Sequence, residues 1–196
     1  MYIDLAQDGD LLRLEQRLRG DRVVGVGEIG LDGHVPRPAL VNQLPWFEAQ
    51  LALARQFDLP VILHVRHAVD AIIHALKRVG GVGGIAHAFN GSRQQADLLI
   101  RMGFKLGFGG TLTYPGSRRI RALAAELPIE ALVLETDAPD IAPVWARGQR
   151  NEPATVARVA DEMAVLRGLS VEAVIAATGL NACEVLPRLG RILAAG

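Results

Sequence analysis

Short apolar segments alternate with helical patterns along this chain, and this alternation constrains the fold more than any other feature. Five apolar segments predict β-strands, at residues 22–31, 60–66, 83–89, 105–110 and 131–137. The stretches between them carry apolar residues at helical spacing. Short apolar strands joined by helices are typical of parallel βα units. We therefore expect an α/β protein, with either an open doubly wound sheet or a (β/α) barrel.

The helical patterns cover most of the remaining chain. The predicted helices span residues 9–19, 38–58, 69–79, 92–102, 117–126, 153–167, 170–177 and 181–187. Pro45 falls inside the second of these stretches and predicts a break or a helix start there. The βα unit is the only repeat, and no linker interrupts it, so we expect one domain over residues 1–196.

The composition is that of a globular protein. Half of the 196 residues are hydrophobic, 21% are charged, and the formal net charge is zero. A neutral balance argues against broad non-specific binding to nucleic acid, although it allows a local basic cleft. Cys183 is the only cysteine, which excludes an intrachain disulfide. No secretory signal or membrane-length apolar run is visible, so we expect a soluble, cytoplasmic protein.

Polar side chains lie at or near the carboxyl ends of the apolar runs in four of the five predicted strands. We call them the strand-end residues: Glu28, His64, His87 and Asp137. Because the carboxyl ends of parallel strands face the same way, these side chains can converge on one site. Two imidazoles and two carboxylates suit Zn²⁺, Mn²⁺ or a similar divalent ion. Taken singly, each residue could be an ordinary buried or capping residue, but the set of four favours a metal centre.

A second pattern, GVGEIG at residues 25–30, matches the G-x-G-x-x-G dinucleotide fingerprint. That motif requires a helix to begin within the glycines, so that its N-terminus meets the pyrophosphate. Here the apolar run continues through Leu31 and a loop follows. The acid about twenty residues further on, Glu48, lies inside a predicted helix. We therefore reject nucleotide-cofactor binding.

Further polar residues lie beside the strand-end residues. Asp32 either orients a metal ligand or caps its loop. Glu135 shares a strand face with Asp137 and either supports the site or fills the interior. His67 and His74 are expected to face solvent.

Three residues are candidates for contacting a substrate. Arg66 lies on the same strand face as His64, where it could meet a phosphate or pair with a neighbouring acid. Arg118 belongs to a basic patch that is either a phosphate-binding lip or a solvated helix face. Asn151 could cap the following helix or contact the substrate.

Six segments, taken together and in order, resemble the TatD family of metal-dependent hydrolases. They are GEIGLD (27–32), VILHVR (61–66), AHAFNGS (86–92), LGFGGTLTYP (106–115), LETDAP (134–139) and RNEP (150–153). The resemblance implies a TIM barrel with one or two metals at the carboxyl ends of its strands. It also implies phosphodiester hydrolysis, often as a 3′-to-5′ deoxyribonuclease acting on single-stranded DNA ends.

The resemblance assigns a role to each strand-end residue. Glu28 would be a carboxylate shared by two metals, with His64 and His87 as the remaining ligands of one. Asp137 would bind the other metal and help to take a proton from the attacking water. A bound Zn²⁺, Mg²⁺ or Mn²⁺ would lower the pKa of that water. Glu28 and Asp137 are thus the expected catalytic residues.

The chain departs from the family pattern at its start. Family members begin with a strand ending in His-x-His, but this sequence contains no His-x-His. The residue after the His-x-Arg motif, usually acidic, is His67. A TIM barrel needs about 250 residues and eight strands, so the first three strands are expected to be missing. Three explanations are open: a misassigned start codon, a natural truncation or fragment, or a partner or second copy that completes the sheet.

The missing His-x-His leaves one complete metal site, so we expect one ion in this chain rather than two. Three functions remain open: a DNA-end nuclease, an ester or amide hydrolase such as an aminoacyl-tRNA deacylase, and a catalytically impaired fragment. The oligomeric state is open as well.

Overall fold

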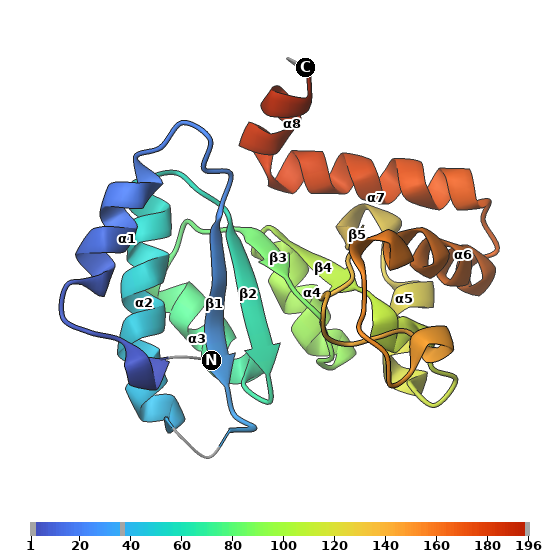
Figure 1. The fold of residues 1–196 in the computed structure, drawn as a ribbon, viewed down its shortest axis with the longest axis horizontal. Coiled ribbons are helices and arrows are strands. Elements are labelled where there is room, and N and C mark those ends of the chain that lie inside the picture. The colour runs from blue at the N-terminus through green and yellow to red at the C-terminus, as the bar shows by residue number, and fades with distance from the viewer. Residues whose placement is uncertain (1–2, 36–37, 195–196) are drawn as a thin grey trace.

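The computed structural model describes residues 3–35 and 38–194. Its centre is one sheet of five parallel strands, which Figure 1 shows side by side. The strands are β1 (Val26–Asp32), β2 (Val61–Arg66), β3 (Gly84–Ala86), β4 (Phe104–Phe108) and β5 (Leu132–Leu134). Each predicted strand is therefore present, although β3 and β5 are shorter than predicted.

The order of the strands decides between the two architectures that the sequence left open. Neighbours in the sheet follow chain order, β1-β2-β3-β4-β5, with no reversal. A doubly wound sheet reverses its strand order near the middle, whereas a (β/α) barrel adds each strand beside the last. The sheet is thus five consecutive strands of a TIM-barrel arrangement.

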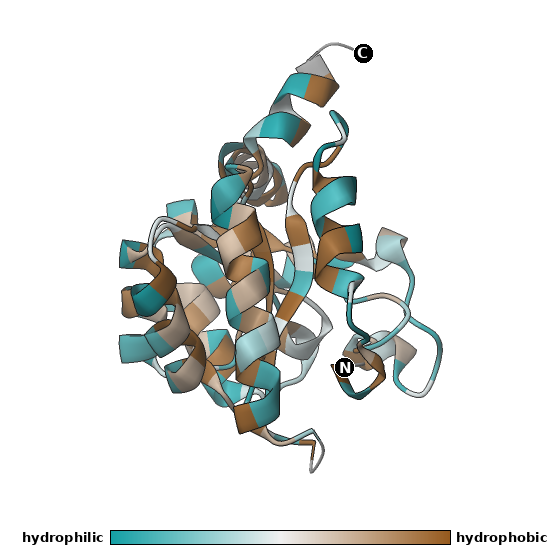
Figure 2. Ribbon diagram, turned by 90° about the vertical axis from the view of Figure 1, so that its left-hand side faces the viewer, coloured by the Kyte–Doolittle hydropathy of each residue, from teal (hydrophilic) through white to brown (hydrophobic). Residues whose placement is uncertain are grey.

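Eight α-helices lie in the part of the chain that the structure describes. They are α1 (Asp10–Leu18), α2 (Leu40–Gln56), α3 (Val69–Val79), α4 (Arg93–Arg101), α5 (Arg118–Glu126), α6 (Val156–Arg167), α7 (Val171–Val185) and α8 (Pro187–Ala194). Short 3₁₀ turns also occur, among them Gly110–Thr113 and Pro153–Thr155. Figure 2 shows apolar and polar residues alternating around the helices, as expected for helices packed on a sheet.

The main core lies between the sheet and the helices that follow the strands. A row of residues in register across four strands, Leu63, Ala86, Leu106 and Leu132, is fully buried. This row belongs to the same apolar cluster as Phe47 of α2 and other helix residues. It marks the helix-covered face of the sheet.

The opposite face, which we call the inner face, carries a second and smaller core. Ile85 and Val133 point to this face, since side chains alternate along a strand. Leu186, between α7 and α8, packs against both. His87 and Glu135 lie two residues further along the same strands and share this face. The inner face therefore has an apolar end near the strand starts and a polar end where the strands finish.

Two helix predictions were wrong. Helix α2 runs through Pro45 without a break. Pro45 is exposed, so water can satisfy the carbonyl group that loses its helical partner. The helices predicted at residues 170–177 and 181–187 are one helix, α7, followed by a separate α8. Asn181 holds α7 in place by donating to the Ile129 and Leu132 carbonyls, each at 2.7 Å.

No single helix among the described residues has the length and apolar character needed to cross a membrane. One pair of helices has this length and apolar character only when the two are counted together. The pair is Pro153–Arg167 and Val171–Val185, and the chain bends by 110° between them.

Candidate metal centre

The structure brings the strand-end residues together at the polar end of the inner face. All four line one cleft of about 1170 Å³. Glu28 lies in β1 and His64 in β2, while His87 and Asp137 follow β3 and β5. Backbone hydrogen bonds from His87 to the Leu63 carbonyl and from Glu135 to the Phe108 carbonyl extend the sheet beyond its assigned strand ends. These bonds fix where the side chains leave the sheet.

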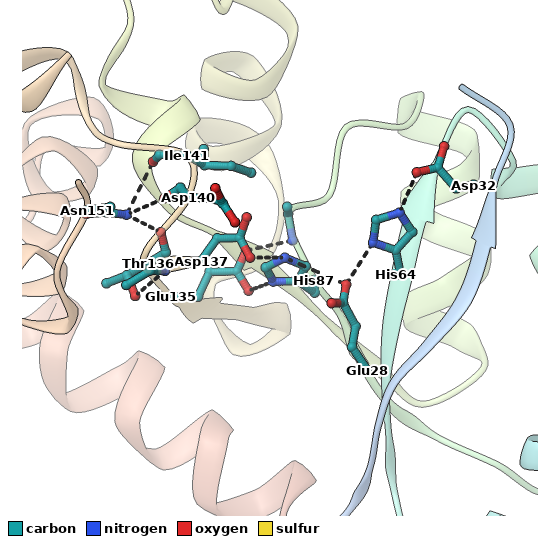
Figure 3. Close-up of polar contacts among 12 residues, drawn as sticks. Glu28, Asp32, His64, His87, Glu135, Thr136, Asp137, Asp140, Ile141 and Asn151 are labelled. Atoms are coloured by element: carbon teal, nitrogen blue, oxygen red, sulfur yellow. Dashed lines mark hydrogen bonds and ion pairs between the residues drawn. The ribbon is translucent and has the colours of Figure 1, made fainter. Parts of the chain in front are cut away.

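Glu28 is the centre of the contacts in this cluster (Figure 3). Its Oε1 lies 2.8 Å from Nδ1 of His64 and 4.0 Å from Nε2 of His87. The same Nε2 lies 3.0 Å from Oδ1 of Asp137. The four side chains therefore form one continuous chain of polar contacts across the cleft.

A β-bulge directs Glu28 into this position. The register between β1 and β2 shifts between Gly27 and Ile29, so Glu28 has no partner across the sheet. Gly27 allows the close approach of the strands that the bulge requires. A Cβ atom there would lie 2.7 Å from the Cβ of Ile62.

A carboxylate also binds the far nitrogen of each histidine. Oε2 of Glu135 lies 2.7 Å from Nδ1 of His87, and its Oε1 accepts from the Ala88 backbone amide at 2.6 Å. Oδ2 of Asp32 lies 3.2 Å from Nε2 of His64. Carboxylates placed in this way orient metal-binding histidines and fix their tautomer. Glu135 therefore supports the site.

Asp32 combines the two roles that the sequence left open. Besides contacting His64, it accepts hydrogen bonds through Oδ1 from the backbone amides of His34, at 2.8 Å, and Val35, at 3.3 Å. Gln43 of α2 is buried and clamps the Asp32 backbone, accepting from its amide at 2.8 Å and donating to its carbonyl at 2.9 Å. Nothing in the sequence singled out Gln43 except that it is polar within a packed helix.

The close packing of acids and histidines changes their proton affinities. Burial lowers the pKa of His87, but the hydrogen bond to Glu135 and the nearby carboxylates outweigh it and raise that pKa to about 9. Burial raises the pKa of Asp137, and the carboxylates of Glu28 and Glu135 add to this. The hydrogen bond from His64 lowers the pKa of Glu28 against the effect of burial. Asp137 is therefore a stronger proton acceptor than an ordinary aspartate.

The raised pKa of His87 predicts that the metal-free protein loses stability as pH rises. The folded value of about 9 exceeds the reference value of 6.5. Its stabilising contribution is fully present below pH 6.5 and disappears as pH rises through about 9. We expect a loss of about 2 kcal/mol in unfolding free energy, after allowing for partial solvent exposure. Urea denaturation of chelator-treated protein at pH 6.5 and 9.5 measures it, with His87→Gln for comparison. An equal pH dependence in both proteins contradicts the prediction.

The donors present fit a divalent cation by their chemistry. Nδ1 of His64, Nε2 of His87 and the carboxylates of Glu28 and Asp137 all face one another, and acids occupy the other histidine nitrogens. Mixed nitrogen and oxygen donors of this kind suit Zn²⁺ or Mn²⁺. Within residues 3–35 and 38–194, however, no three His, Cys, Asp or Glu side chains surround a common point at ligand distance. The donors hydrogen-bond to one another instead, and a cation would replace those bonds.

The residues predicted to contact a substrate lie in three different settings. Arg66 is exposed and lines the cleft. Among the described residues no carboxylate pairs with it, which leaves its guanidinium available. Arg118 does not line the cleft, whereas the neighbouring Arg119 does. Contact of Arg118 with a substrate therefore stays a prediction. Consecutive helical residues point about 100° apart, and the sequence does not say which of them faces the cleft.

Asn151 does not reach the cleft, which contradicts a direct contact with a substrate. The structure favours the other role that the sequence left open, at the start of the following helix. Its side chain is only 2% exposed. Its amide donates to the carbonyls of Thr136 and Asp140, and its Oδ1 accepts from the Glu152 amide and the Thr155 hydroxyl, both at 2.9 Å. Asn151 thus ties the loop that carries Asp137 to the start of the next helix.

Because Asn151 satisfies several buried polar groups, Asn151→Ala should be strongly destabilising. We expect a loss of about 2 kcal/mol in unfolding free energy, since the carbonyls of Thr136 and Asp140 would lose their buried donor. Chemical denaturation measures this, with the exposed Arg150→Ala as the matched control. If both variants are equally stable, the bonding of Asn151 does not hold this loop.

Comparisons with known proteins agree with this fold. The model of the family described as TatD related DNase matches residues 2–187. An uncharacterised metal-dependent hydrolase of Haemophilus influenzae is 38% identical over 192 residues, covering 94% of this chain and 73% of that protein. The crystal structure of the TatD homologue YjjV of Escherichia coli superposes with a TM-score of 0.88 at 39% identity, covering 93% of this chain and 71% of that one.

One relative has a named activity. A protein of Erwinia amylovora, named 3′-5′ ssDNA/RNA exonuclease TatD, is 35% identical over 167 residues, covering 82% of this chain and 64% of that protein. The matched family model, these relatives and the sequential five-strand sheet all agree. The chain belongs to the TatD family of metal-dependent hydrolases.

Proposed function

We propose that this chain hydrolyses phosphodiester bonds at the 3′ ends of single-stranded DNA. One observation carries the proposal: carboxylates and imidazoles from four strand ends meet in a cleft whose walls also hold Arg66 and Arg119. Acids and histidines on the floor suit a cation, and the guanidinium groups on the walls suit phosphates. The activity named for the Erwinia amylovora relative supports a nucleic-acid substrate and this cleavage polarity.

The chain's own residues divide the chemistry between them. Nδ1 of His64, Nε2 of His87 and the Glu28 carboxylate would hold the cation. When bound, the cation lowers the pKa of water and offsets negative charge on the phosphate. Asp137 takes the proton from the attacking water, a role that its raised pKa supports. Glu135 and Asp32 keep the two imidazoles in the orientation that this requires.

We also propose that a chain of this sequence holds one ion rather than two. Glu28, His64 and His87 supply a complete set of ligands. The second set would have only Glu28 and Asp137, because no His-x-His is present in the sequence. Three protein ligands are usual for a catalytic zinc, whereas two leave a weak site.

The test uses chelator-treated protein reloaded with Mn²⁺, Mg²⁺ or Zn²⁺. The substrate is single-stranded DNA labelled at its 5′ end, and the expected products form a ladder shortened from the 3′ end. An aminoacyl ester panel runs in parallel, and calorimetric titration counts the ions. Ester cleavage without DNA cleavage would favour the alternative, an ester hydrolase of the deacylase type. No turnover of either substrate with metal bound would indicate a catalytically impaired chain.

A further inference from the structure

Two histidines lie together at the rim of the cleft, outside the cluster of strand-end residues. His34 follows β1 and His67 follows β2, and their rings stack with centroids 5.5 Å apart and planes 30° apart. Both side chains are exposed, and His67 lines the cleft next to Arg66. The proposed chemistry uses neither of them.

The two loops that carry these histidines are bound to each other. The Gly33 amide donates to the Arg66 carbonyl at 2.7 Å. A Cβ atom at Gly33 would lie 2.5 Å from the His67 carbonyl oxygen, so only glycine allows this approach. On the other side, Asp32 accepts from the His34 amide at 2.8 Å. The stacked pair is therefore preorganised by the contacts that also hold Asp32 against His64.

The rim pair has the chemistry of a surface that binds nucleobases. Aromatic rings with a free face stack on any base, and a neighbouring guanidinium binds the phosphate of the same nucleotide. In the described part of the chain neither ring pairs with a carboxylate. The pair also lacks a third donor that would make it a metal site, within the same residues.

The cleft is large enough to hold more than the scissile phosphate. Its volume of about 1170 Å³ exceeds the roughly 300–1,000 Å³ typical of pockets for drug-sized ligands. On the side of α5, Nη2 of Arg119 donates to Oδ1 of Asn90 at 2.8 Å, which holds that guanidinium at the cleft. Cationic groups on two walls, with the strand-end residues between them, fit a strand that crosses the cleft.

We propose that the His34–His67 pair is a stacking platform for one base flanking the scissile bond, with Arg66 binding the adjoining phosphate. This inference rests on the proposed function, because it names how the same cleft holds its substrate. It predicts that the histidine after the His-x-Arg segment contributes to substrate binding and does not take part in bond cleavage.

The test compares base-bearing and abasic substrates. His67→Asn removes the ring and suits the left-handed backbone at this position, where φ is 53°. His34→Ala removes the supporting ring without changing His67. Each variant is assayed on single-stranded oligonucleotides that carry one abasic nucleotide at successive positions near the 3′ end. Binding of a cleavage-resistant phosphorothioate oligonucleotide is measured in parallel by fluorescence anisotropy.

For His67→Asn we expect KM and the dissociation constant to rise about tenfold on base-bearing DNA, with kcat within about twofold. One abasic position should abolish the difference between variant and wild type. His34→Ala should show a smaller rise at the same position. The control is His74→Ala, an exposed histidine of α3 outside the cleft lining, which should behave as wild type.

Three results would overturn the platform. If wild type cleaves DNA but His67→Asn matches it on every substrate, the platform is wrong and the proposed function stands. If His67→Asn weakens binding of base-bearing and abasic substrates equally, His67 does not contact a base. If wild type neither binds nor cleaves oligonucleotides, the platform and the proposed function fail together. Thermal melting followed by circular dichroism confirms that each variant is folded.

Discussion

Asp137→Asn is expected to lower the rate of phosphodiester hydrolysis by about a thousandfold. The asparagine side chain has nearly the same shape but cannot accept a proton from water. Metal-binding affinity should fall much less than the rate, because Glu28, His64 and His87 remain. The loop should keep its conformation, since Asn151 holds Thr136 and Asp140 on either side of the substitution.

The measurement is kcat on labelled single-stranded DNA at saturating metal, together with the pH profile. Loss of a base with a raised pKa should remove the rise in rate between acidic and neutral pH. Asp161→Asn, an exposed acid of α6, is the matched control and should keep full activity. A rate within tenfold of wild type for Asp137→Asn would show that another group accepts the proton.

Glu28→Gln should lower the affinity for the divalent ion by at least about a hundredfold. Removing a group that hydrogen-bonds to a metal ligand already costs about 10- to 100-fold in affinity or activity. Glu28 is itself a proposed ligand and contacts both histidines, so its loss should cost more. The neutral amide also leaves the positive charge of His87 with one carboxylate fewer beside it. We therefore expect the raised pKa of His87 to fall in this variant.

Isothermal titration calorimetry with Mn²⁺ and Zn²⁺ measures the affinity without any need for activity. The control is Glu130→Gln, whose exposed side chain lies outside the cleft lining. An NMR titration of the His87 ring gives its pKa in the metal-free variant. If Glu28→Gln binds metal as wild type does, the cation site lies elsewhere and the assignment of Glu28 fails.

Much of the fold and of the site follows from local patterns. Apolar runs located all five strands, and the polar residues that follow four of these runs are the strand-end residues. The pattern works because a charge inside a buried strand is costly unless solvent or a partner compensates for it. Glu28 meets this condition at the bulge of β1, where its side chain leaves the sheet toward the two histidines. In a parallel sheet those ends share one edge, so Glu28, His64, His87 and Asp137 converge.

Other features depended on contacts between distant segments. The sequence left open whether the sheet is doubly wound or barrel-like, because strand order is a property of packing. The break predicted at Pro45 and the gap between the helices predicted at residues 170–177 and 181–187 did not occur. Tertiary contacts, such as the bonds from Asn181 to two carbonyls, outweigh the weak local preference of a single residue.

The finer details of the site were decided in the same way. Whether Arg118 or Arg119 faces the cleft depends on the rotation of α5, and periodicity alone does not set that angle. The sequence does not decide whether Asn151 caps a helix or contacts a substrate. In the structure it is buried because the loop after β5 folds back over it. Local sequence determines which groups a strand or helix carries, whereas the partner of a polar group depends on which surfaces meet in the folded chain.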